Sequence, residues 1–347
     1  MIKKQWLKFI FIFSGIILLI LCLFYPIPYY IEIPGKAVPV SDYVKVPKYK
    51  TKANGTFRLV YVNLMHATLA TYVWSYTQNY ATRISADEVT GTDNDKQYNK
   101  VQEYYMDDAL NEAKYVALKL ANKKVKRTYE GIYVMSILNN SNFRGKLKVG
   151  DTIIAINGKH YNSTQGFMHA IESLNNHEKI KVTYERATKK HVISGRTIKL
   201  EQTGKVGIGI TLANRSKVTS PVKIVTHMDS LGGPSAGLMI TLQLYSQLSQ
   251  KDFLKGRNVA GTGTISADGS VGDIGGVDKK VVASARAGAT IFFVPNNAVS
   301  KAELNADSSA KNNYEIAKET AKKIGTKMKI VPVKNISDAI KYLKNKN

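Results

Sequence analysis

The turn at Gly232–Gly237 carries the residues with the clearest chemical potential, because it reads Gly-Gly-Pro-Ser-Ala-Gly and an apolar run follows from Leu238. The glycines and the proline predict a turn, and the apolar run predicts a helix. Ser235 would then present its hydroxyl at the start of that helix, where unpaired backbone N–H groups and the helix dipole favour a developing oxyanion. The pattern suits a nucleophilic serine, and it equally suits a glycine-rich turn with a serine N-cap.

A serine hydroxyl becomes a strong nucleophile only when a neighbouring base takes its proton. His227 and Asp229 allow a Ser-His-Asp interpretation, but His227 lies on the predicted strand that leads into the same turn. Lys280, which follows Gly275 and Gly276, is the other candidate base. A lysine can take this role when desolvation lowers its pKa toward neutrality.

Helical periodicity selects Lys280 rather than the adjacent lysine. A helix is predicted over residues 277–287, and Lys280 lies at three- and four-residue spacing from apolar and small residues. The residues that share this face are Val277, Val281, Ser284, Ala285 and Gly288. Lys279 and Arg286 fall on the other side, which is predicted to face solvent. Lys280 is therefore expected to point inward, and a lysine whose stem reaches back to water is the alternative.

The C-terminal part of the chain alternates strand and helix patterns, which predicts an α/β or α+β unit. The predicted strands are 206–212, 222–227, 258–265, 290–294 and 328–333. The predicted helices are 235–248, 277–287, 314–324 and 337–343. Ser235 and Lys280 thus start two different helices of one unit.

A different pattern fills the middle of the chain, with short strands, a helix over 164–174 and the stretch Leu147-Lys148-Val149-Gly150-Asp151 ahead of Asn157-Gly158. This pattern resembles a PDZ domain. Such domains bind an extended peptide as an added strand and capture its terminal carboxylate with a backbone loop. The resemblance places that loop just before or within Gly131, Ile132 and Tyr133. A small β-rich domain without a ligand is the alternative.

The N-terminal segment predicts a membrane anchor. Lys3, Lys4 and Lys8 precede an apolar run, and residues 9–28 supply about 20 residues, enough to cross the ~30 Å hydrocarbon layer. The lysines would stay in the cytoplasm, which places the remainder outside. A cleaved signal peptide is the alternative, but the bulky, proline-rich stretch after the run offers no small-x-small cleavage site.

The region between anchor and PDZ-like segment shows no catalytic constellation. Residues 31–56 are predicted to be extended, 57–62 to form a strand, 68–80 and 101–121 to form helices, and 87–98 to form a polar surface loop.

Composition restricts the partners and cofactors. A formal net charge of +24 suggests an acidic neighbour such as an anionic membrane surface or cell-wall polymer. The lysines are scattered along the chain, which argues against a nucleic-acid groove. Cys22 is the only cysteine, so no disulfide or cysteine metal site can form within one chain. Neither a Gly-x-x-x-x-Gly-Lys-[Ser/Thr] nor a His-Glu-x-x-His motif occurs, and we expect no cofactor and no metal.

Taken together, the Gly-Pro-Ser-Ala-Gly turn, Thr262-Gly263 and the Gly-Gly-x-x-x-Lys stretch ending at Lys280 resemble the protease domain of Lon-type Ser-Lys peptidases. With the anchor and the PDZ-like segment, the chain is similar to membrane-anchored Lon-like serine proteases of Gram-positive bacteria, the YlbL/SepM type. The resemblance implies that Ser235 is the nucleophile, that Lys280 is the general base and that Thr262 orients the lysine amine.

The same resemblance implies that backbone N–H groups around Ser235 hold the oxyanion, with Gly233 and Ala236 in support, whereas Pro234 has no N–H to offer. Two departures stand out. Large Lon enzymes carry an acidic residue three positions before the serine, where this chain has Gly232, and they carry a fused ATPase whose motif is missing here.

The expected fold is an α+β multidomain chain. The expected segments are a cytoplasmic tail (1–8), a transmembrane anchor (9–28), a membrane-proximal α/β region (29–123), a PDZ domain (124–200) and a Lon-like protease domain (201–347). The resemblance implies an ATP-independent serine endopeptidase outside the cytoplasmic membrane, acting on secreted peptides, including pheromones, or on unfolded segments, and it leaves homo-oligomerisation open. The alternative is a non-catalytic, membrane-anchored PDZ adaptor on a Lon-like scaffold.

Overall fold

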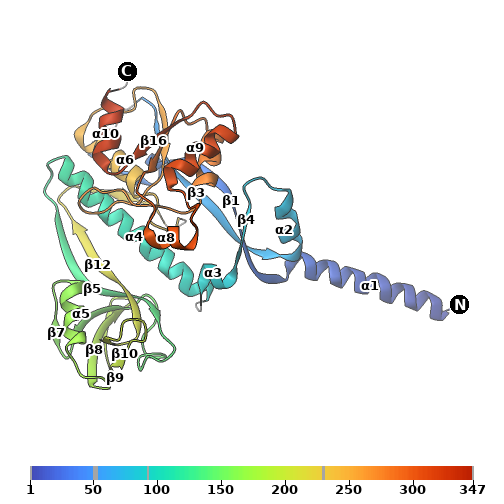
Figure 1. Ribbon diagram of the computed structural model, residues 1–347, viewed down its shortest axis with the longest axis horizontal. Coiled ribbons are helices and arrows are strands. Elements are labelled where there is room, and N and C mark those ends of the chain that lie inside the picture. Colours follow the sequence, from blue (N-terminus) through green and yellow to red (C-terminus); the bar gives the residue numbers. More distant parts are fainter. Residues whose placement is uncertain (1, 50–53, 92–93, 229–230, 346–347) are drawn as a thin grey trace.

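A six-stranded sheet lies at the centre of the larger unit in this computed structural model, which describes residues 2–49, 54–91, 94–228 and 231–345 (Figure 1). In sheet order the strands are β16 (Lys329–Val333), β15 (Ile291–Pro295), β14 (Asn258–Gly261), β3 (Thr56–Thr68), β1 (Pro26–Pro39) and β4 (Thr82–Ser85). The first four run parallel, and β1 pairs antiparallel with both β3 and β4. The sheet therefore joins strands of the predicted membrane-proximal region to strands of the predicted protease domain.

Helices cover both faces of this sheet. One face carries α4 (Asp95–Leu120), α6 (Gly237–Ser249) and α10 (Ile336–Asn345), and the other carries α7 (Val277–Arg286) and α9 (Asn313–Lys323). Neighbouring residues of a strand point to opposite faces. Leu59 and Phe293 accordingly lie in the first core, whereas Val60 and Phe292 lie in the second. The result is a three-layered unit. Helix α6, which follows Ser235, and helix α7, which contains Lys280, lie on opposite sides of the sheet.

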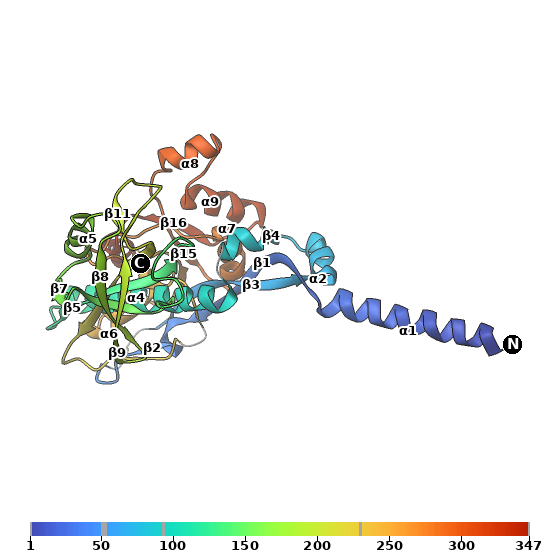
Figure 2. The ribbon, with the colours of Figure 1, turned by 90° about the horizontal axis from the view of Figure 1, so that it is seen from below.

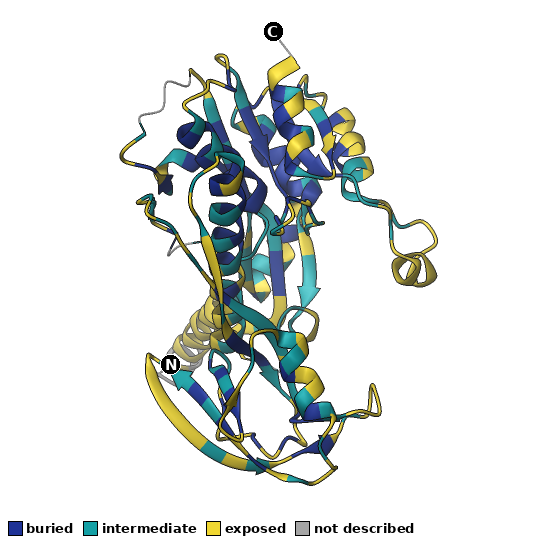
Figure 3. Cartoon of the chain, turned by 90° about the vertical axis from the view of Figure 1, so that its left-hand side faces the viewer, coloured by how far each residue is buried: buried dark blue, intermediate teal, exposed yellow. Residues whose placement is uncertain are grey.

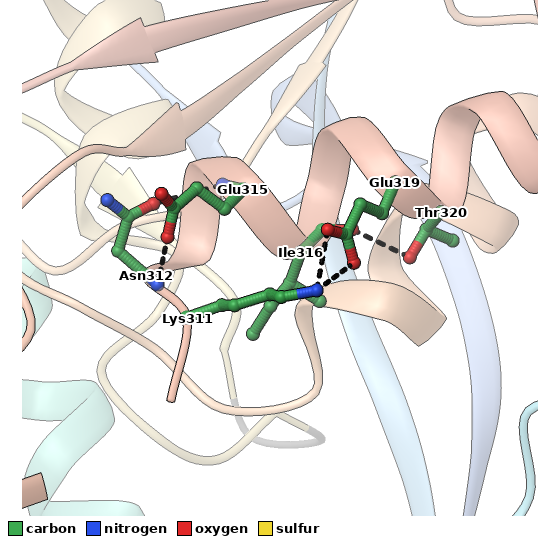
Figure 4. A network of polar contacts seen from close by, with 6 residues as sticks. All are labelled: Lys311, Asn312, Glu315, Ile316, Glu319 and Thr320. Atoms are coloured by element: carbon green, nitrogen blue, oxygen red, sulfur yellow. Dashed lines mark hydrogen bonds and ion pairs between the residues drawn. The ribbon is translucent and has the colours of Figure 1, made fainter. Parts of the chain in front are cut away.

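Local polar contacts fix the start of α9 (Figure 4). The Asn312 side chain accepts the Glu315 N–H, and the Glu315 carboxylate accepts the Asn312 N–H, which makes a reciprocal cap. Lys311 Nζ lies 2.6 Å from a carboxylate oxygen of Glu319 on the surface. Such exposed pairs contribute at most about 1 kcal/mol, so the cap and the buried face of the helix decide its position.

The smaller unit is a second sheet, in the order β12 (Ile210–Thr219), β5 (Lys126–Ile137), β6 (Thr152–Ile156), β8 (Lys179–Arg186) and β9 (Lys189–Arg196), with β7 (Lys159–His160) paired to β6. Helix α5 (Thr164–Glu172) buries Phe167 against this sheet, beside Phe143 and Ile153. β12 comes from the part of the chain assigned to the protease region by sequence, yet it returns to pair with β5. The predicted strand over 206–212 overlaps only the first residues of β12, and its pairing with β5 cannot be read from local patterns.

Helix α4 lies between the two units (Figures 1 and 2). It packs against α6, and its Tyr104 ring stacks on Tyr133 of β5 with centroids 4.3 Å apart. The Tyr104 hydroxyl also donates to the backbone oxygen of Asn214 in β12 at 2.5 Å. One helix thus contacts both the smaller sheet and the helix that follows Ser235.

The start of α4 corrects the predicted loop over 87–98. Helix α3 (Ala86–Thr90) lies in this segment, and α4 already begins at Asp95 with a reciprocal cap between Asn94 and Gln97. The polar composition concealed these turns, because caps rather than apolar periodicity define them.

Helix α1 (Ile2–Phe24) projects from the body (Figure 1), and its described side chains are mostly exposed (Figure 3). β1 begins at Pro26, so the last residues of the predicted anchor over 9–28 belong to a strand. Within the described residues, no helix combines the length and the apolar character needed to cross a membrane. The predicted transmembrane anchor is therefore not supported.

Candidate active site

Ser235, Thr262 and Lys280 meet at the carboxyl end of β14. Lys280 Nζ lies 2.9 Å from Ser235 Oγ and 3.4 Å from Thr262 Oγ1. Ser235 comes from the turn before α6, Thr262 directly follows β14, and Lys280 lies in the first turn of α7. In sheets of this kind, functional sites form where parallel strands end and helices from both faces converge. The structure thus brings together the three residues that the sequence singles out.

Backbone contacts hold the serine turn against the segment after β14. The Gly263 N–H donates to the Ser235 carbonyl at 2.9 Å, and the Thr262 hydroxyl donates to the same oxygen at 3.2 Å. The Leu238 N–H donates back to the Gly263 carbonyl at 3.1 Å. Close packing accompanies these bonds, since a Cβ on Gly237 would lie 2.7 Å from Ile265 Cγ2. The position of Ser235 is therefore set by the strand that carries Thr262.

The N–H groups around the turn divide into used and available donors. The Gly233 N–H donates to the Gln102 carbonyl of α4 at 3.1 Å, and the Gly237 N–H donates to the Pro234 carbonyl at 3.3 Å. Among the described residues of the turn, the N–H groups of Ser235 and Ala236, which lie next to the Ser235 hydroxyl in the chain, are the candidates for stabilising an oxyanion. Of the two residues expected to support the serine, Gly233 anchors the turn to α4 instead.

Burial changes the acid–base behaviour of Lys280. The side chain is only 4% exposed, which confirms the prediction that it points inward. Desolvation disfavours the charged ammonium and lowers the pKa of Lys280 from 10.5 to about 8, while the negative charge of Glu32 partly opposes this shift. A substantial fraction of the amine is therefore neutral just above neutral pH, as a general base requires.

The prediction for Lys279 is wrong, because this side chain is also only 4% exposed. Its Nζ lies 3.1 Å from Glu32 Oε2 on β1 and 3.3 Å from Asp278 Oδ2. Helical periodicity assumes one buried face, but α7 packs against β1 and β3 as well as α9. Arg286 is exposed, which confirms its half of the prediction, so the solvent-facing side of α7 lies nearer to it than to Lys279. Sequence reasoning missed Glu32 altogether, since no local pattern links it to Lys279.

The histidine alternative receives no support from the described residues. His227 is exposed, and its backbone N–H donates to the Tyr43 carbonyl at 2.8 Å. Asp229 lies outside the described residues. Within the part of the chain that the structure describes, the base within hydrogen-bonding distance of Ser235 Oγ is Lys280.

The predicted peptide-binding loop at Gly131, Ile132 and Tyr133 also needs correction. These residues lie in β5, which has β12 on one side and β6 on the other. Ile132 and Tyr133 are buried, and Gly131 is pressed against the Ile153 carbonyl of β6. A peptide can add as a strand only where backbone groups at an edge are unpaired. An interior strand cannot offer that edge.

The nearest edge of this sheet lies one strand away, at β12. This strand ends the sheet order, and a hollow runs beside it. The hollow is lined from β12 by Leu212, Ala213 and Asn214 and from the start of α5 by Thr164 and Gln165. The stretch Gly207-Ile208-Gly209 immediately before β12 was the sequence signal that could have indicated it, because glycines allow backbone N–H groups to approach a ligand.

Comparison with known proteins assigns a different family to each of the two units. Residues 225–345 match the Lon protease (S16) C-terminal proteolytic domain family, and residues 116–195 match the PDZ domain family. The chain is 32% identical over 106 residues to a Lon protease from Aster yellows witches'-broom phytoplasma. It is 36% identical over 109 residues to a Lon protease from Trichlorobacter lovleyi.

These matches cover 30% and 31% of this chain and 11% of each relative, so the chain spans about a tenth of the length of the curated relatives it matches. A solved PDZ domain of the SdrC-like protein from Listeria monocytogenes is 32% identical, with 25% of this chain and 90% of that chain covered and a TM-score of 0.24. On the two family matches, the chain carries a PDZ domain followed by a serine-peptidase domain of the Lon protease (S16) type.

Proposed function

We propose that this protein is an ATP-independent serine endopeptidase in which Ser235 and Lys280 form the catalytic pair. One observation carries the proposal. The Lys280 amine, buried and with a pKa lowered to about 8, lies 2.9 Å from Ser235 Oγ. A nucleophile and a base within hydrogen-bonding reach, with a third group beside the base, is the arrangement that activates a serine. Thr262, 3.4 Å from the same amine, supplies that third group.

In the acylation step, the neutral Lys280 amine takes the proton from Ser235 Oγ as this oxygen attacks the scissile carbonyl. The N–H groups of Ser235 and Ala236 would stabilise the negative charge on the carbonyl oxygen. The Lys280 ammonium then returns its proton to the leaving amine, and the C–N bond breaks. Ser235 is left as an ester, and Lys280 is again neutral.

In the deacylation step, Lys280 takes a proton from a water molecule that attacks the ester carbonyl. The tetrahedral intermediate uses the same N–H donors, and its collapse returns the proton to Ser235 Oγ. Each cycle consumes one water and yields a new carboxylate and a new amine. One residue therefore acts alternately as base and acid, as lysine can when its pKa lies near the working pH.

Substrates are proposed from three considerations. The chain contains no ATPase motif, so we propose peptides and already unfolded segments rather than folded proteins. The β12 edge and the hollow beside α5 favour an extended peptide that adds to the PDZ sheet. Two finer parts rest on the resemblance alone: substrates that include secreted peptides such as signalling pheromones, and a catalytic unit outside the cytoplasmic membrane.

The test is cleavage without nucleotide. The purified full chain is incubated with unfolded casein and with a short peptide pool, and products are identified by mass spectrometry. Wild type and a Ser266→Ala control, which changes an exposed serine, should both give products, and Ser235→Ala should give none. Cleavage that persists in Ser235→Ala would contradict the proposal. A wild-type protein that binds peptides without cutting them would favour the adaptor alternative.

A further inference from the structure

A second buried lysine lies beside the candidate dyad, and the proposed mechanism gives it no task. Lys279 is as buried as Lys280, and its amine lies between two carboxylates, Glu32 at 3.1 Å and Asp278 at 3.3 Å. Glu32 is itself only 17% exposed. Burying charged groups costs free energy that their mutual attraction does not necessarily return. A buried pair of this kind next to a reactive lysine therefore calls for an explanation beyond stability.

The ion pair between Glu32 and Lys279 joins β1 to α7, two elements whose relative position matters for the dyad. Glu32 lies on β1 between β3 and β4, and Lys279 lies in the first turn of α7. The contact is close, because a Cβ on Gly276 would lie 3.1 Å from Glu32 Oε1 and 2.9 Å from Val62 Cγ1. Lys280 belongs to this same turn of α7. Any movement of α7 relative to β1 would therefore change the distance between Lys280 and Ser235.

The ion pair between Glu32 and Lys279 also sets the net charge that faces Lys280. Glu32 attracts a proton onto the Lys280 amine and so raises the pKa of Lys280 against the effect of burial. A glutamate without a counter-charge would exert the larger pull, because a nearby opposite charge commonly moves a pKa by about 1–3 units. The positive charge of Lys279 cancels much of that pull. The adjacent lysine thus favours the neutral, proton-accepting form of Lys280.

We propose that Lys279 is a positioning residue for the Ser235–Lys280 pair, whose ion pair with Glu32 fixes α7 against β1 and neutralises the carboxylate that faces Lys280. The inference rests on the proposed function for its catalytic meaning. Asp278 of α7 is the second partner of Lys279, and Tyr98 of α4, whose pKa is raised by burial and by Glu32, stays neutral at working pH.

The test is the pH dependence of kcat/KM for one peptide with four full-length variants. In Lys279→Met, Glu32 loses its counter-charge, and the rising limb of the profile should move to higher pH by about 1 unit or more. In Glu32→Gln, the limb should move to lower pH. In the double variant the two shifts should largely cancel. Arg286→Met removes a more accessible charge from the same helix and should leave the profile unchanged.

A direct titration separates this inference from the proposed function. The pKa of the Lys280 amine is measured by NMR of proteins labelled at the lysine Cε, with Lys280→Arg to assign the signal. Unchanged titrations and profiles in folded Lys279→Met and Glu32→Gln would overturn the inference, even if the wild type cleaves peptides. Shifts of opposite sign without any cleavage by the wild type would uphold the tuning and refute the peptidase. If Lys279→Met fails to fold, Glu32→Gln alone provides the test. A lower Lys280 pKa in this variant would support the inference, and an unchanged pKa would overturn it.

Discussion

Burial of the charged Lys280 side chain lowers the stability of the folded protein, and the neighbouring charges do not offset this cost. Its pKa falls from 10.5 to about 8, so holding the charged form in the folded chain costs about 3 kcal/mol below that pH. This is a substantial part of the stability of an ordinary domain. The cost makes sense if the neutral amine is needed, because burial is the means by which the protein obtains it.

We predict that Lys280→Met stabilises the folded chain at pH 7 by about 1–3 kcal/mol. Between the folded pKa near 8 and the unfolded value near 10.5, the unfolded wild type binds more protons, so wild-type stability rises with pH across this window. The advantage of the methionine should therefore shrink toward pH 10. Urea unfolding of both proteins at the two pH values measures it. A gain that is equal at both values, or a loss at pH 7, would show that the lysine is not held at a lowered pKa.

Sequence reasoning was most effective where a residue type and its spacing carry the chemistry. Ser235 and Lys280 could be selected because a turn and a helix face position them, and Thr262 was indicated by the resemblance to Lon-type peptidases. Lys279 could not be placed, because periodicity reports one buried face and cannot show that a second surface covers the same helix. Glu32 could not be found because its partner is brought to it only by the sheet.

At the scale of elements, the start of α7 is the critical junction. Gly276 has a left-handed backbone with φ of 63°, and the space where its side chain would lie is occupied by Val62 and Glu32. A Cβ added to the preceding Gly275 would meet no heavy atom within 4 Å. The two glycines look equivalent in the sequence but differ in what the fold requires of them.

We predict that Gly276→Ala destabilises the fold by about 1–3 kcal/mol, because a left-handed residue with a side chain is strained and the methyl group would press on Glu32. Peptide cleavage should fall as α7 shifts. Gly275→Ala is the matched control and should change neither property beyond about 0.5 kcal/mol. Thermal unfolding and cleavage rates measure both. Equal effects of the two substitutions would mean that the contact between α7 and β1 does not position the site.

Most elements with clear periodicity lie where the patterns place them, including α9, β15 and β16. The missed turns near residue 94 depend on caps, and caps of polar residues look like loops in a pattern search. The predicted strand over 57–62 extends through β3 to Thr68 in the structure. Local patterns thus predicted the type of most elements better than their ends.

At the scale of the molecule, strand order was the information that the sequence could not supply. The resemblance to a PDZ domain placed the peptide-binding loop at Gly131, Ile132 and Tyr133, but β5 lies inside its sheet. β12, from beyond the predicted end of the PDZ segment, forms the edge instead. Helix α4 contacts β12 through Tyr104 and the serine turn through the Gln102 carbonyl, so both units share one connecting element.

We predict that Gln165→Trp, which fills the hollow beside β12, lowers kcat/KM for casein about tenfold, equivalent to about 1.4 kcal/mol of lost binding. Turnover of a short peptide should stay unchanged, because the dyad lies in the other unit. His191→Trp on β9, the opposite edge strand, is the control and should affect neither substrate. Competition with C-terminal peptides gives a second readout. Equal losses on both substrates in a folded Gln165→Trp protein would argue against presentation by this groove.

The central claim is that a neutral, buried Lys280 activates Ser235. Its most direct test is the cleavage rate of one peptide by purified wild type, Lys280→Ala and Lys280→Arg between about pH 6 and 10, a range chosen to bracket the lowered pKa, with folding checked by circular dichroism. The wild-type rate should rise through about pH 8, following the lowered pKa of Lys280. Lys280→Ala should lose about 10²–10⁴-fold, and Lys280→Arg should not recover activity because guanidinium stays protonated. A folded Lys280→Ala protein that cleaves at the wild-type rate would contradict the account.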